Sequence, residues 1–389
     1  MKKIVLFGSG VVAEQNLALK PDFIVDNNAD IIGSKFHGLD IKSPDVLKDK
    51  STIYQIVVCT TSVGEVKKQL TNYGFIWGQT ANIAKQLAER SKISDLEEAS
   101  FSFLISSGLP SSAESFSGGG IYKITEKQDY PEISKIYEGN THGLISLENG
   151  YYAFTCQGEG IKILDNNLKV VKTIPLRKGL RPHGLKRYKD LWVLVSSNRD
   201  CILAVDDNGK EVFEYSFSKK LALFESPQHH CNDIEVVGDI AYVSMFSVTG
   251  NWKRNVFDGG IIEVNLINGS MTTIINNLTM PHSISYTPEQ GLTILNSFKG
   301  TLLASNFSEQ AKLPGFLRGY DSDESYHYLG ESKNRNFSRL DTGRKPVSID
   351  TRITIMNKEF GFSRSIQLPS RISELHAIIL LKNMNTKQI

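Results

Sequence analysis

From residue 101 onward, short apolar runs alternate with turn signals, a pattern that predicts β-strands joined by tight turns. The turn signals include Asp165-Asn166-Asn167 and Asn268-Gly269, residue types that favour turns. The strands recur in similar units, and repeats of this length indicate a propeller or a solenoid. Five continuous units begin at residues 141–144, 182–185, 232–234, 281–284 and 318–320.

The two ends of this region complete a sixth unit. Residues 101–105 and 119–124 form strands without an innermost partner, whereas residues 376–381 form an innermost strand without a blade. Pairing these ends closes the ring and removes exposed strand edges. The pattern therefore predicts an all-β, NHL-like six-bladed propeller over residues 101–382, followed by a tail at 383–389.

The first 85 residues follow a different pattern. An apolar run at residues 3–7 ends in Gly8-Ser9-Gly10, residues 11–20 carry helical spacing, and residues 21–26 form a strand that ends in Asp26. A third buried strand is expected at residues 56–61. This order predicts a Rossmann-like α/β domain over residues 1–85, joined to the propeller by a helical linker at 86–100.

The glycines of this domain raise the question of a cofactor. Gly8 and Gly10 would let the backbone approach a phosphate at the start of a helix, and Asp26 stands where a ribose hydroxyl would be bound. A nucleotide, a nucleotide sugar or NAD(P) would fit such a site. Because Ala13 takes the place of the usual third glycine, the alternative is a degenerate domain that only packs against its neighbour.

These segments also carry a resemblance. The runs Lys3-Ile4-Val5-Leu6-Phe7-Gly8-Ser9-Gly10, Ile24-Val25-Asp26-Asn27-Asn28 and Ser43-Pro44-Asp45-Val46-Leu47 resemble the small Rossmann-type domains attached to bacterial enzymes of surface-polysaccharide and sugar-nucleotide metabolism. Some sugar acetyltransferases use such a domain to bind a nucleotide sugar. The resemblance implies a similar ligand for residues 1 to about 80.

Aligning the repeats brings one residue of each innermost strand into register. These residues are His142, His183, Asn232, His282, Arg318 and His376. Innermost strands line the central channel of a propeller, so four histidines are expected to converge there. Neutral imidazoles are good ligands for zinc-like divalent transition metals, and we therefore predict a metal held by His142, His183, His282 and His376.

Further residues are candidates for catalysis and substrate binding. Arg318 is expected to hold a carboxylate or phosphate, His230 precedes Asn232 by two positions and so faces the same side, and Asp233 would add a carboxylate beside it. The predicted substrate-binding residues are Asn232, Asn296, Lys299, Lys333 and Arg335. The alternative is that the histidines only hydrogen-bond neighbouring blades and that the loops are ordinary solvated segments.

The propeller region carries a second resemblance. Met280-Pro281-His282, Leu295-Asn296-Ser297, residues 313–319 and Gly330-Glu331-Ser332-Lys333 resemble signature segments of an uncharacterised family of bacterial six-bladed propeller proteins, over residues 100 to about 382. That family implies no activity. More distantly, six-bladed propellers with central metals include lactonases and lyases, but a shared fold does not fix function.

Composition narrows the setting. A formal net charge of +2 gives no reason to expect nucleic acid as a partner. The four cysteines are scattered without a CxxC pair, which favours free thiols in a reducing compartment. The apolar run after Met1 breaks at Gly8, and no stretch has the ~20 apolar residues of a membrane span. We therefore expect a cytoplasmic protein with a small-molecule ligand.

Together these observations predict a metal-assisted enzyme of bacterial surface-carbohydrate metabolism, acting on a sugar or nucleotide sugar by lyase, hydrolase or isomerase chemistry on the propeller axis. One alternative is a non-catalytic propeller that senses a ligand or binds a protein. Another is an NAD(P)-linked sugar oxidoreductase, although no tyrosine and lysine pair typical of such enzymes stands out.

Overall fold

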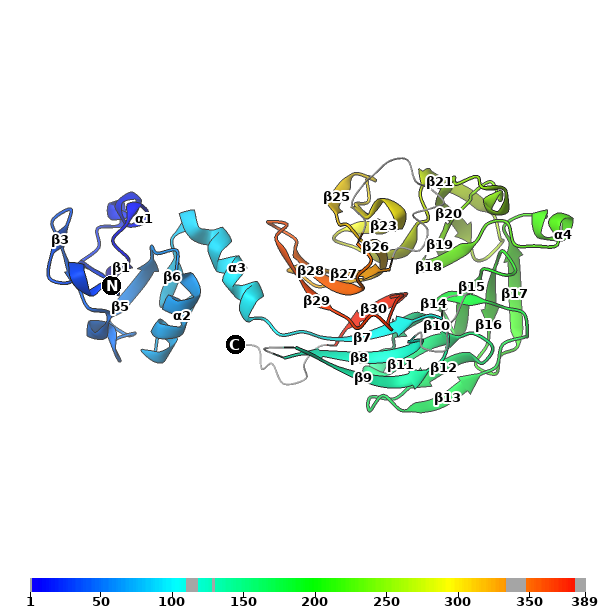
Figure 1. Ribbon diagram of the computed structural model, residues 1–389, viewed down its shortest axis with the longest axis horizontal. Helices are drawn as coiled ribbons and strands as arrows, with labels where there is room; N and C mark the ends of the chain where they lie inside the picture. Colours follow the sequence, from blue (N-terminus) through cyan, green and yellow to red (C-terminus); the bar gives the residue numbers. More distant parts are fainter. Residues whose placement is uncertain (1, 110–117, 128–129, 334–347, 382–389) are drawn as a thin grey trace. The chain divides into compact units, whose positions relative to one another are not determined.

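The computed structural model describes residues 2–109, 118–127, 130–333 and 348–381. The chain divides into two compact units, Met1–Ala99 and Ser100–Ile389, each of which is described by itself (Figure 1). Within the part of the chain that the structure describes, no helix is long and apolar enough to cross a membrane.

The first unit is a six-stranded mixed sheet in the order β3-β4-β2-β1-β5-β6. Five of the strands run parallel, and β3 pairs antiparallel with β4. Its strands are β1 (Lys3–Phe7), β2 (Phe23–Val25), β3 (Lys35–Phe36), β4 (Leu39–Lys42), β5 (Tyr54–Val58) and β6 (Ala81–Ile83), and its helices are α1 (Val11–Gln15), α2 (Val63–Asn72) and α3 (Ala88–Glu98).

The prediction of a Rossmann-like α/β domain is wrong. The sheet is mixed, α1 has five residues in place of the expected helix over residues 11–20, and a hairpin with a 3-10 turn replaces a crossover helix between β2 and β4. Pro21 disfavours a helical conformation at Lys20, which adopts a left-handed φ of 53°. The segment between β2 and β4 is rich in Asn, Asp and Gly, which favour turns over helix.

The second unit contains six four-stranded antiparallel sheets among its described residues, which confirms the prediction of a six-bladed propeller. Blades 1 to 3 consist of β10 (Thr141–Ser146), β11 (Tyr152–Cys156), β12 (Gly160–Leu164) and β13 (Val170–Ile174); β14 (Pro182–Tyr188), β15 (Leu191–Ser196), β16 (Cys201–Val205) and β17 (Glu211–Ser216); and β18 (Cys231–Val237), β19 (Ile240–Met245), β20 (Gly259–Asn265) and β21 (Met271–Leu278).

Blades 4 to 6 repeat this arrangement. They consist of β22 (His282–Thr287), β23 (Gly291–Asn296), β24 (Thr301–Leu303) and β25 (Glu309–Lys312); β26 (Phe316–Ser322), β27 (Tyr326–Ser332), β28 (Arg352–Asn357) and β29 (Ser363–Gln367); and β30 (Ala377–Leu380), β7 (Ser102–Ser107), β8 (Gly120–Glu126) and β9 (Pro131–Glu138). Blade 6 pairs the last strand of the chain, β30, with β7, so the ring closes as the sequence predicted (Figure 1).

The apolar cores lie between neighbouring blades. One cluster joins Val193 and Ile202 of blade 2 to Ile234 and Val243 of blade 3. Because both faces of a blade pack against neighbours, the middle strands are continuous apolar runs instead of alternating ones, and every residue of β16 is buried. The same pattern made these strands recognisable in the sequence.

Hydrogen bonds near the axis tie each blade to the next. Three of them are Thr155 Oγ1 donating to the His183 carbonyl at 3.0 Å, Gly319 N–H donating to Ser283 Oγ at 2.9 Å, and Leu380 N–H donating to Asp321 Oδ2 at 2.7 Å. These contacts fix the innermost strands relative to one another, which positions the side chains on the axis.

Candidate functional site

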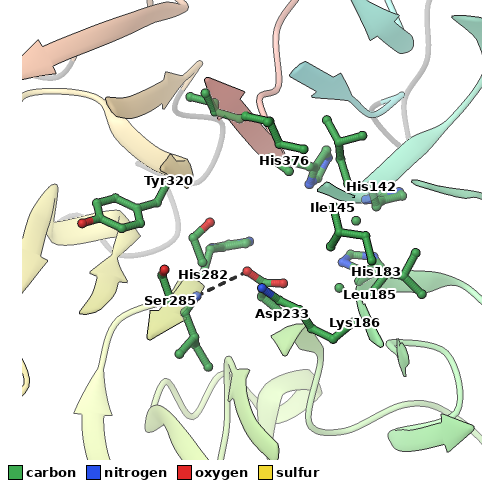
Figure 2. A pocket seen from close by; sticks show the side chains of 18 of the residues that line it. His142, Ile145, His183, Leu185, Lys186, Asp233, His282, Ser285, Tyr320 and His376 are labelled. Atoms are coloured by element: carbon green, nitrogen blue, oxygen red, sulfur yellow. Dashed lines mark hydrogen bonds between the residues drawn. The ribbon is translucent and has the colours of Figure 1, made fainter. Parts of the chain in front are cut away.

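Two cavities lie on the propeller axis, on either side of a ring of polar side chains. The basic cavity, about 270 Å³, is lined by residues at and before the starts of the innermost strands and by residues of the loops after β15 and β19. The axial cavity, about 370 Å³, is lined by residues further along the same strands (Figure 2). Four residues line both cavities: His142, His183, Asn232 and His376.

The predicted register of channel residues agrees with where the structure places them. His142, His183, Asn232, His282 and Arg318 occupy one of the first three positions of their innermost strands, and His376 directly precedes β30. In β10, β14, β18, β22 and β26 the pairing with the next strand shifts at this point. Such bulges redirect side chains, and here they occur where the channel residues stand.

Two glycines allow the innermost strands to approach closely beside this ring. A Cβ atom on Gly143 would stand 2.5 Å from the His183 carbonyl oxygen, and one on Gly184 would stand 2.4 Å from Asp233 Oδ1. No side chain fits at these distances. The glycine after each of the first two channel histidines therefore serves strand packing.

Three histidines form a tight group at the centre of the ring. The rings of His142 and His183 are stacked at 4.2 Å with 20° between their planes, and His376 lies 4.2 Å from His142. Both ring nitrogens of His142 and Nε2 of His183 are buried without a hydrogen-bond partner. Burial, with neighbouring positive charge adding to it, lowers the pKa of both side chains well below the usual value, so both rings are neutral at pH 7.

The histidine rings of the predicted metal site are not oriented toward a common ion. The lone pairs of imidazoles lie in the ring planes, and the planes of His142 and His183 are stacked 4.2 Å apart, so one ring would have to turn before the two side chains shared an ion. His282 lines only the axial cavity, and its Nδ1 contacts the Met280 carbonyl and Ser297 Oγ, both at 2.9 Å. Among the described residues, no group of three or more His, Cys, Asp or Glu side chains is arranged to hold a metal.

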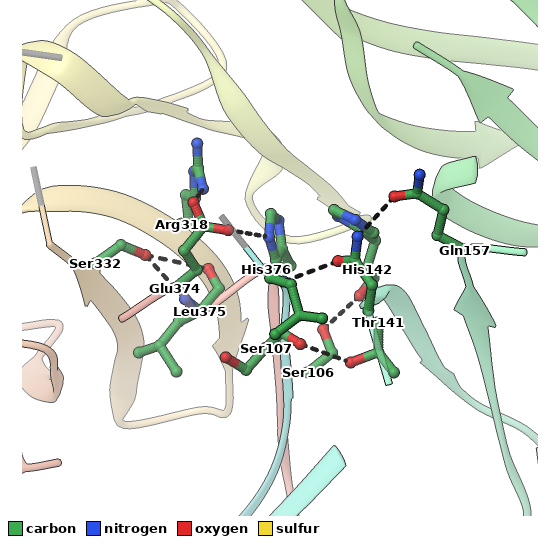
Figure 3. A network of polar contacts seen from close by, with 12 residues as sticks. Ser106, Ser107, Thr141, His142, Gln157, Arg318, Ser332, Glu374, Leu375 and His376 are labelled. Atoms are coloured by element: carbon green, nitrogen blue, oxygen red, sulfur yellow. Dashed lines mark hydrogen bonds and ion pairs between the residues drawn. The ribbon is translucent and has the colours of Figure 1, made fainter. Parts of the chain in front are cut away.

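A buried carboxylate links two of the channel residues. Glu374, 3% exposed, accepts a hydrogen bond from Arg318 Nη1 on Oε1 at 3.0 Å, and its Oε2 lies 3.2 Å from His376 Nε2 (Figure 3). Burial lowers the pKa of the Arg318 guanidinium to about 10, so it stays charged at pH 7. Arg318 Nε is buried without a hydrogen-bond partner.

Arg181 adds a second guanidinium to the basic cavity. It directly precedes β14, and its buried Nε also lacks a hydrogen-bond partner. Burial and the neighbouring charge of Arg318 lower the pKa of Arg181. With Lys253 the basic cavity has three cationic side chains in its lining against one carboxylate, that of Glu374.

Aromatic rings and His230 form another part of the wall. His230 lies 4.4 Å from the ring of Phe246 and 5.7 Å from that of Trp252. Its backbone is left-handed, with φ of 51°. The buried carboxylate of Asp200 accepts N–H groups from Gln228, His229 and His230, and these bonds hold the strained segment in place.

Asp233 lines the axial cavity, whereas His230 lines the basic cavity. Its carboxylate accepts N–H groups from Ile234 at 2.9 Å and from Ile284 of the next blade at 3.3 Å, and burial raises its pKa to about 7. The carboxylate that contacts a channel histidine is instead that of Glu374.

Three predicted substrate-binding residues line neither cavity. Asn296 is buried, and its Oδ1 accepts the Thr279 N–H at 2.8 Å. Lys299 and Lys333 are exposed. Arg335 lies outside the described residues. Asn232, in contrast, lines both cavities, and its buried Oδ1 has no partner.

The predicted cofactor residues of the first unit have contacts of their own. Gly8 has φ of 103°, and a Cβ there would lie 3.2 Å from the Cys59 and Thr60 backbones, so close packing requires this glycine. Asp26 accepts hydrogen bonds from Ser9 N–H at 3.0 Å and Ser9 Oγ at 2.8 Å. No atom lies within 4 Å of a Cβ built on Gly10. A nucleotide-type ligand here stays a prediction.

The sequence reasoning missed Arg181, Glu374, Phe246, Trp252 and Asp200. A signal was available for two of them. Arg181 stands two positions before His183 and Glu374 two positions before His376, the same offset that led to His230 before Asn232. Extending that offset to every repeat would have found both residues.

The comparisons with known proteins support the fold and assign no activity. The sequence profile of the family described as a domain of unknown function, DUF4915, matches residues 131–389. No curated protein matches the chain. The expectation of an uncharacterised propeller family is confirmed, whereas the resemblance of the first unit to sugar-nucleotide enzymes is not shown.

Solved structures similar to this chain are distant in sequence. A protein of unknown function from Bacteroides caccae is 11% identical, with 73% of this chain and 100% of that chain covered and a TM-score of 0.51. A chain in a nidogen/laminin complex is 12% identical, with 72% and 98% covered and a TM-score of 0.50. A virginiamycin B lyase from Staphylococcus aureus is 12% identical, with 69% and 85% covered and a TM-score of 0.43. These similarities show the fold alone.

Proposed function

The chain belongs to the DUF4915 family, whose description assigns no activity, and we propose that its propeller is an enzyme acting on a small acidic sugar in the basic cavity. The proposed chemistry is proton abstraction next to a carboxylate, the first step of many lyase and isomerase reactions. The support comes from the side chains that line the basic cavity.

One observation carries the proposal: unpartnered polar atoms belong to five residues that line one cavity. They are Arg181 Nε, Arg318 Nε, both ring nitrogens of His142, His183 Nε2 and Asn232 Oδ1. Leaving a buried polar group without a partner costs about 1–3 kcal/mol, and most buried groups avoid it. Neighbouring side chains cover these atoms, so a polar ligand would supply the missing partners after a small rearrangement of the cavity lining.

The charges of the cavity favour an anion. Arg181 and Arg318 are the guanidinium groups of the lining, and the planar fork of arginine matches a carboxylate or a phosphate. Glu374 engages one nitrogen of Arg318 and leaves Nε without a partner. Burial and then the repulsion from Arg318 lower the pKa of Arg181, and an anionic group placed between the two arginines would offset that repulsion.

The aromatic wall favours a sugar as the remainder of the ligand. Trp252 and Phe246 are both nearly buried, and their ring centroids lie 4.7 Å apart beside His230. Aromatic faces bind the C–H faces of sugar rings, while neighbouring polar groups bind the hydroxyls. A volume of about 270 Å³ is enough for a monosaccharide-sized group.

The proton-transfer residue of the proposal is His376, with Glu374 as the positioning residue. The Glu374 carboxylate orients the imidazole through Nε2. In a uronate, the carbon next to the carboxylate carries an acidic C–H, and His376 takes this proton while the electron pair of the C–H bond moves toward the carboxylate. Arg318 and Arg181 stabilise the extra charge there. Elimination expels a substituent of the next carbon, which leaves with a proton from water and gives an unsaturated product, whereas isomerisation needs a second group that returns a proton to the other face.

A divalent transition metal at the histidine ring stays a prediction from the sequence, and no step of this chemistry depends on it. If His142 or His183 turned out of the stack, their unpartnered nitrogens would serve as its ligands. A bound metal would act as a Lewis acid on the substrate carboxylate.

Deuterium exchange tests the proposal. Wild-type protein is incubated with glucuronate or galacturonate glycosides in D2O, and proton NMR follows the C–H next to the carboxylate. Loss of that signal, or appearance of an unsaturated product, is expected with wild-type protein and not with His376→Gln. His37→Gln, at an exposed histidine of the other unit, serves as the control. Exchange that survives in His376→Gln, or its absence with every uronate tested, contradicts the proposal.

A further inference from the structure

A surface patch beside the basic cavity combines exposed apolar side chains with cations. It consists of helix α4 (Lys220–Phe224), which connects β17 to β18, together with Lys219 and the loop at residues 249–256. Figure 1 shows α4 standing out from the blades. Pro227 follows α4 closely, and Pro227, Trp252 and Lys253 all line the basic cavity, so the patch borders that cavity.

The apolar side chains of the patch are more exposed than a packed helix allows. Leu223 is 72% exposed, Phe224 is 39% exposed, and Val256 in the adjoining loop is 43% exposed. No residue of α4 is buried. Exposed apolar side chains on a protruding segment do not stabilise the fold by burial. Their grouping therefore indicates a surface that a membrane or another molecule covers.

The cations of the patch surround these apolar side chains. Residues 219–225 and 249–256 contain Lys219, Lys220, Lys253 and Arg254 against a single acid, Glu225. The Arg254 guanidinium lies 4.0 Å from the centre of the Phe224 ring. Lys220 Nζ donates to Asn251 Oδ1 at 3.1 Å and to the Thr249 carbonyl, so the helix and the loop form one surface.

We propose that this patch docks the protein on an anionic membrane surface and holds the basic cavity next to the lipid headgroups. Leucine and phenylalanine side chains enter the boundary between headgroups and acyl chains, and the flanking lysines and arginine bind lipid phosphates. Charge complementarity supports an anionic surface. Only three large apolar side chains of the patch are exposed, which favours a membrane over a protein partner, because a stable protein interface buries about 800 Å² on each side.

Vesicle flotation tests this proposal. Full-length protein is mixed with phosphatidylcholine vesicles with or without phosphatidylglycerol. Wild-type protein is expected to float with the anionic vesicles only, and added salt should release it. The double variant Leu223→Ser/Phe224→Ser is expected to bind at least about tenfold more weakly. Lys253→Gln/Arg254→Gln should weaken binding to anionic vesicles as well.

The matched control changes two exposed valines on another blade. Val170 and Val171 of β13 are 41% and 55% exposed, so Val170→Ser/Val171→Ser removes a similar apolar area without altering the patch. Near-ultraviolet circular dichroism confirms that each variant is folded. The proposal is overturned if wild-type protein does not bind anionic vesicles, if Val170→Ser/Val171→Ser loses as much binding as Leu223→Ser/Phe224→Ser, or if poly-glutamate binds the patch while vesicles do not.

Discussion

Replacing Glu374 with glutamine separates the two roles that we assign to this carboxylate, which are its ion pair with Arg318 and its orientation of His376. Glu374 and Arg318 are both nearly buried, and their ion pair measures 3.0 Å. Removing one partner of a buried ion pair costs about 3–5 kcal/mol because the other charge stays uncompensated. The glutamine oxygen still accepts one hydrogen bond, which returns about 1 kcal/mol. We therefore expect Glu374→Gln to destabilise the propeller by roughly 3 kcal/mol.

Thermal unfolding measures this change. At about 2–4 °C per kcal/mol for a large domain, the melting temperature should fall by roughly 6–12 °C. The double variant Glu374→Gln/Arg318→Met should recover most of the loss, because no buried charge is then left without a partner. Glucuronate should raise the melting temperature of Glu374→Gln more than that of the wild type, since Arg318 no longer donates to the Glu374 carboxylate. Proton exchange by His376 should become slower, because the carboxylate that orients its imidazole is gone.

The reasoning about Glu374 is refuted by either of two results. If the melting temperature of Glu374→Gln stays within about 2 °C of wild type, the buried Arg318 guanidinium does not need the Glu374 carboxylate to neutralise its charge. If glucuronate stabilises the variant less than the wild type, Glu374 contributes to anion binding directly and does not compete for Arg318.

Three further predictions follow from the same site. Acidification below about pH 6.5 should destabilise the propeller, because burial lowers the pKa of His142, His183 and His282 in the folded protein. Below that pH the unfolded chain therefore binds more protons than the folded chain. Calorimetry across pH should show stability rising toward neutrality, and a flat profile contradicts this prediction. Trp252→Leu should weaken glucuronate binding about tenfold or more but leave phosphate binding nearly unchanged in calorimetric titrations. The metal prediction expects about one transition metal per chain by elemental analysis and its loss in folded His183→Ala; metal-free wild-type protein after reconstitution contradicts it.

The propeller was predictable because its signals are periodic and local. Strands buried on both faces read as apolar runs, and turns of Asp, Asn and Gly mark their ends. The repeated His-Gly-Leu segments fixed the register, and His142 and His183 stand where that register predicts. Closure between β30 and β7 followed from counting strands.

The first unit was not predictable from its glycines. Gly8-Ser9-Gly10 after an apolar strand is a local signal that a Rossmann domain and a simpler sheet share. The difference lies in the connections, where Pro21 and the Asn, Asp and Gly residues after Asp26 prevent long helices. In the structure, Ser9 N–H and Ser9 Oγ donate to the Asp26 carboxylate, so the groups that would bind a nucleotide bind each other.

The site was only partly predictable because its chemistry depends on tertiary contacts. Asp233 was expected beside His230, but the register shift in β18 directs it to the axial cavity, where it binds the next blade. Glu374 and Arg181 precede their strands, and the only sequence signal for them is their offset of two positions before a channel histidine. Their importance becomes visible only when the ring brings Arg318 next to Glu374.

Isothermal titration calorimetry tests the central claim, that the basic cavity binds an acidic sugar through its arginines. Wild-type protein, Arg181→Gln, Arg318→Gln and the control Arg371→Gln, an exposed arginine that lines neither cavity, are each titrated with glucuronate and with glucose. The account predicts that glucuronate binds wild type and Arg371→Gln but not the other two variants, and that glucose binds none of them. Equal binding of glucose and glucuronate, or glucuronate binding that survives both arginine substitutions, would contradict it.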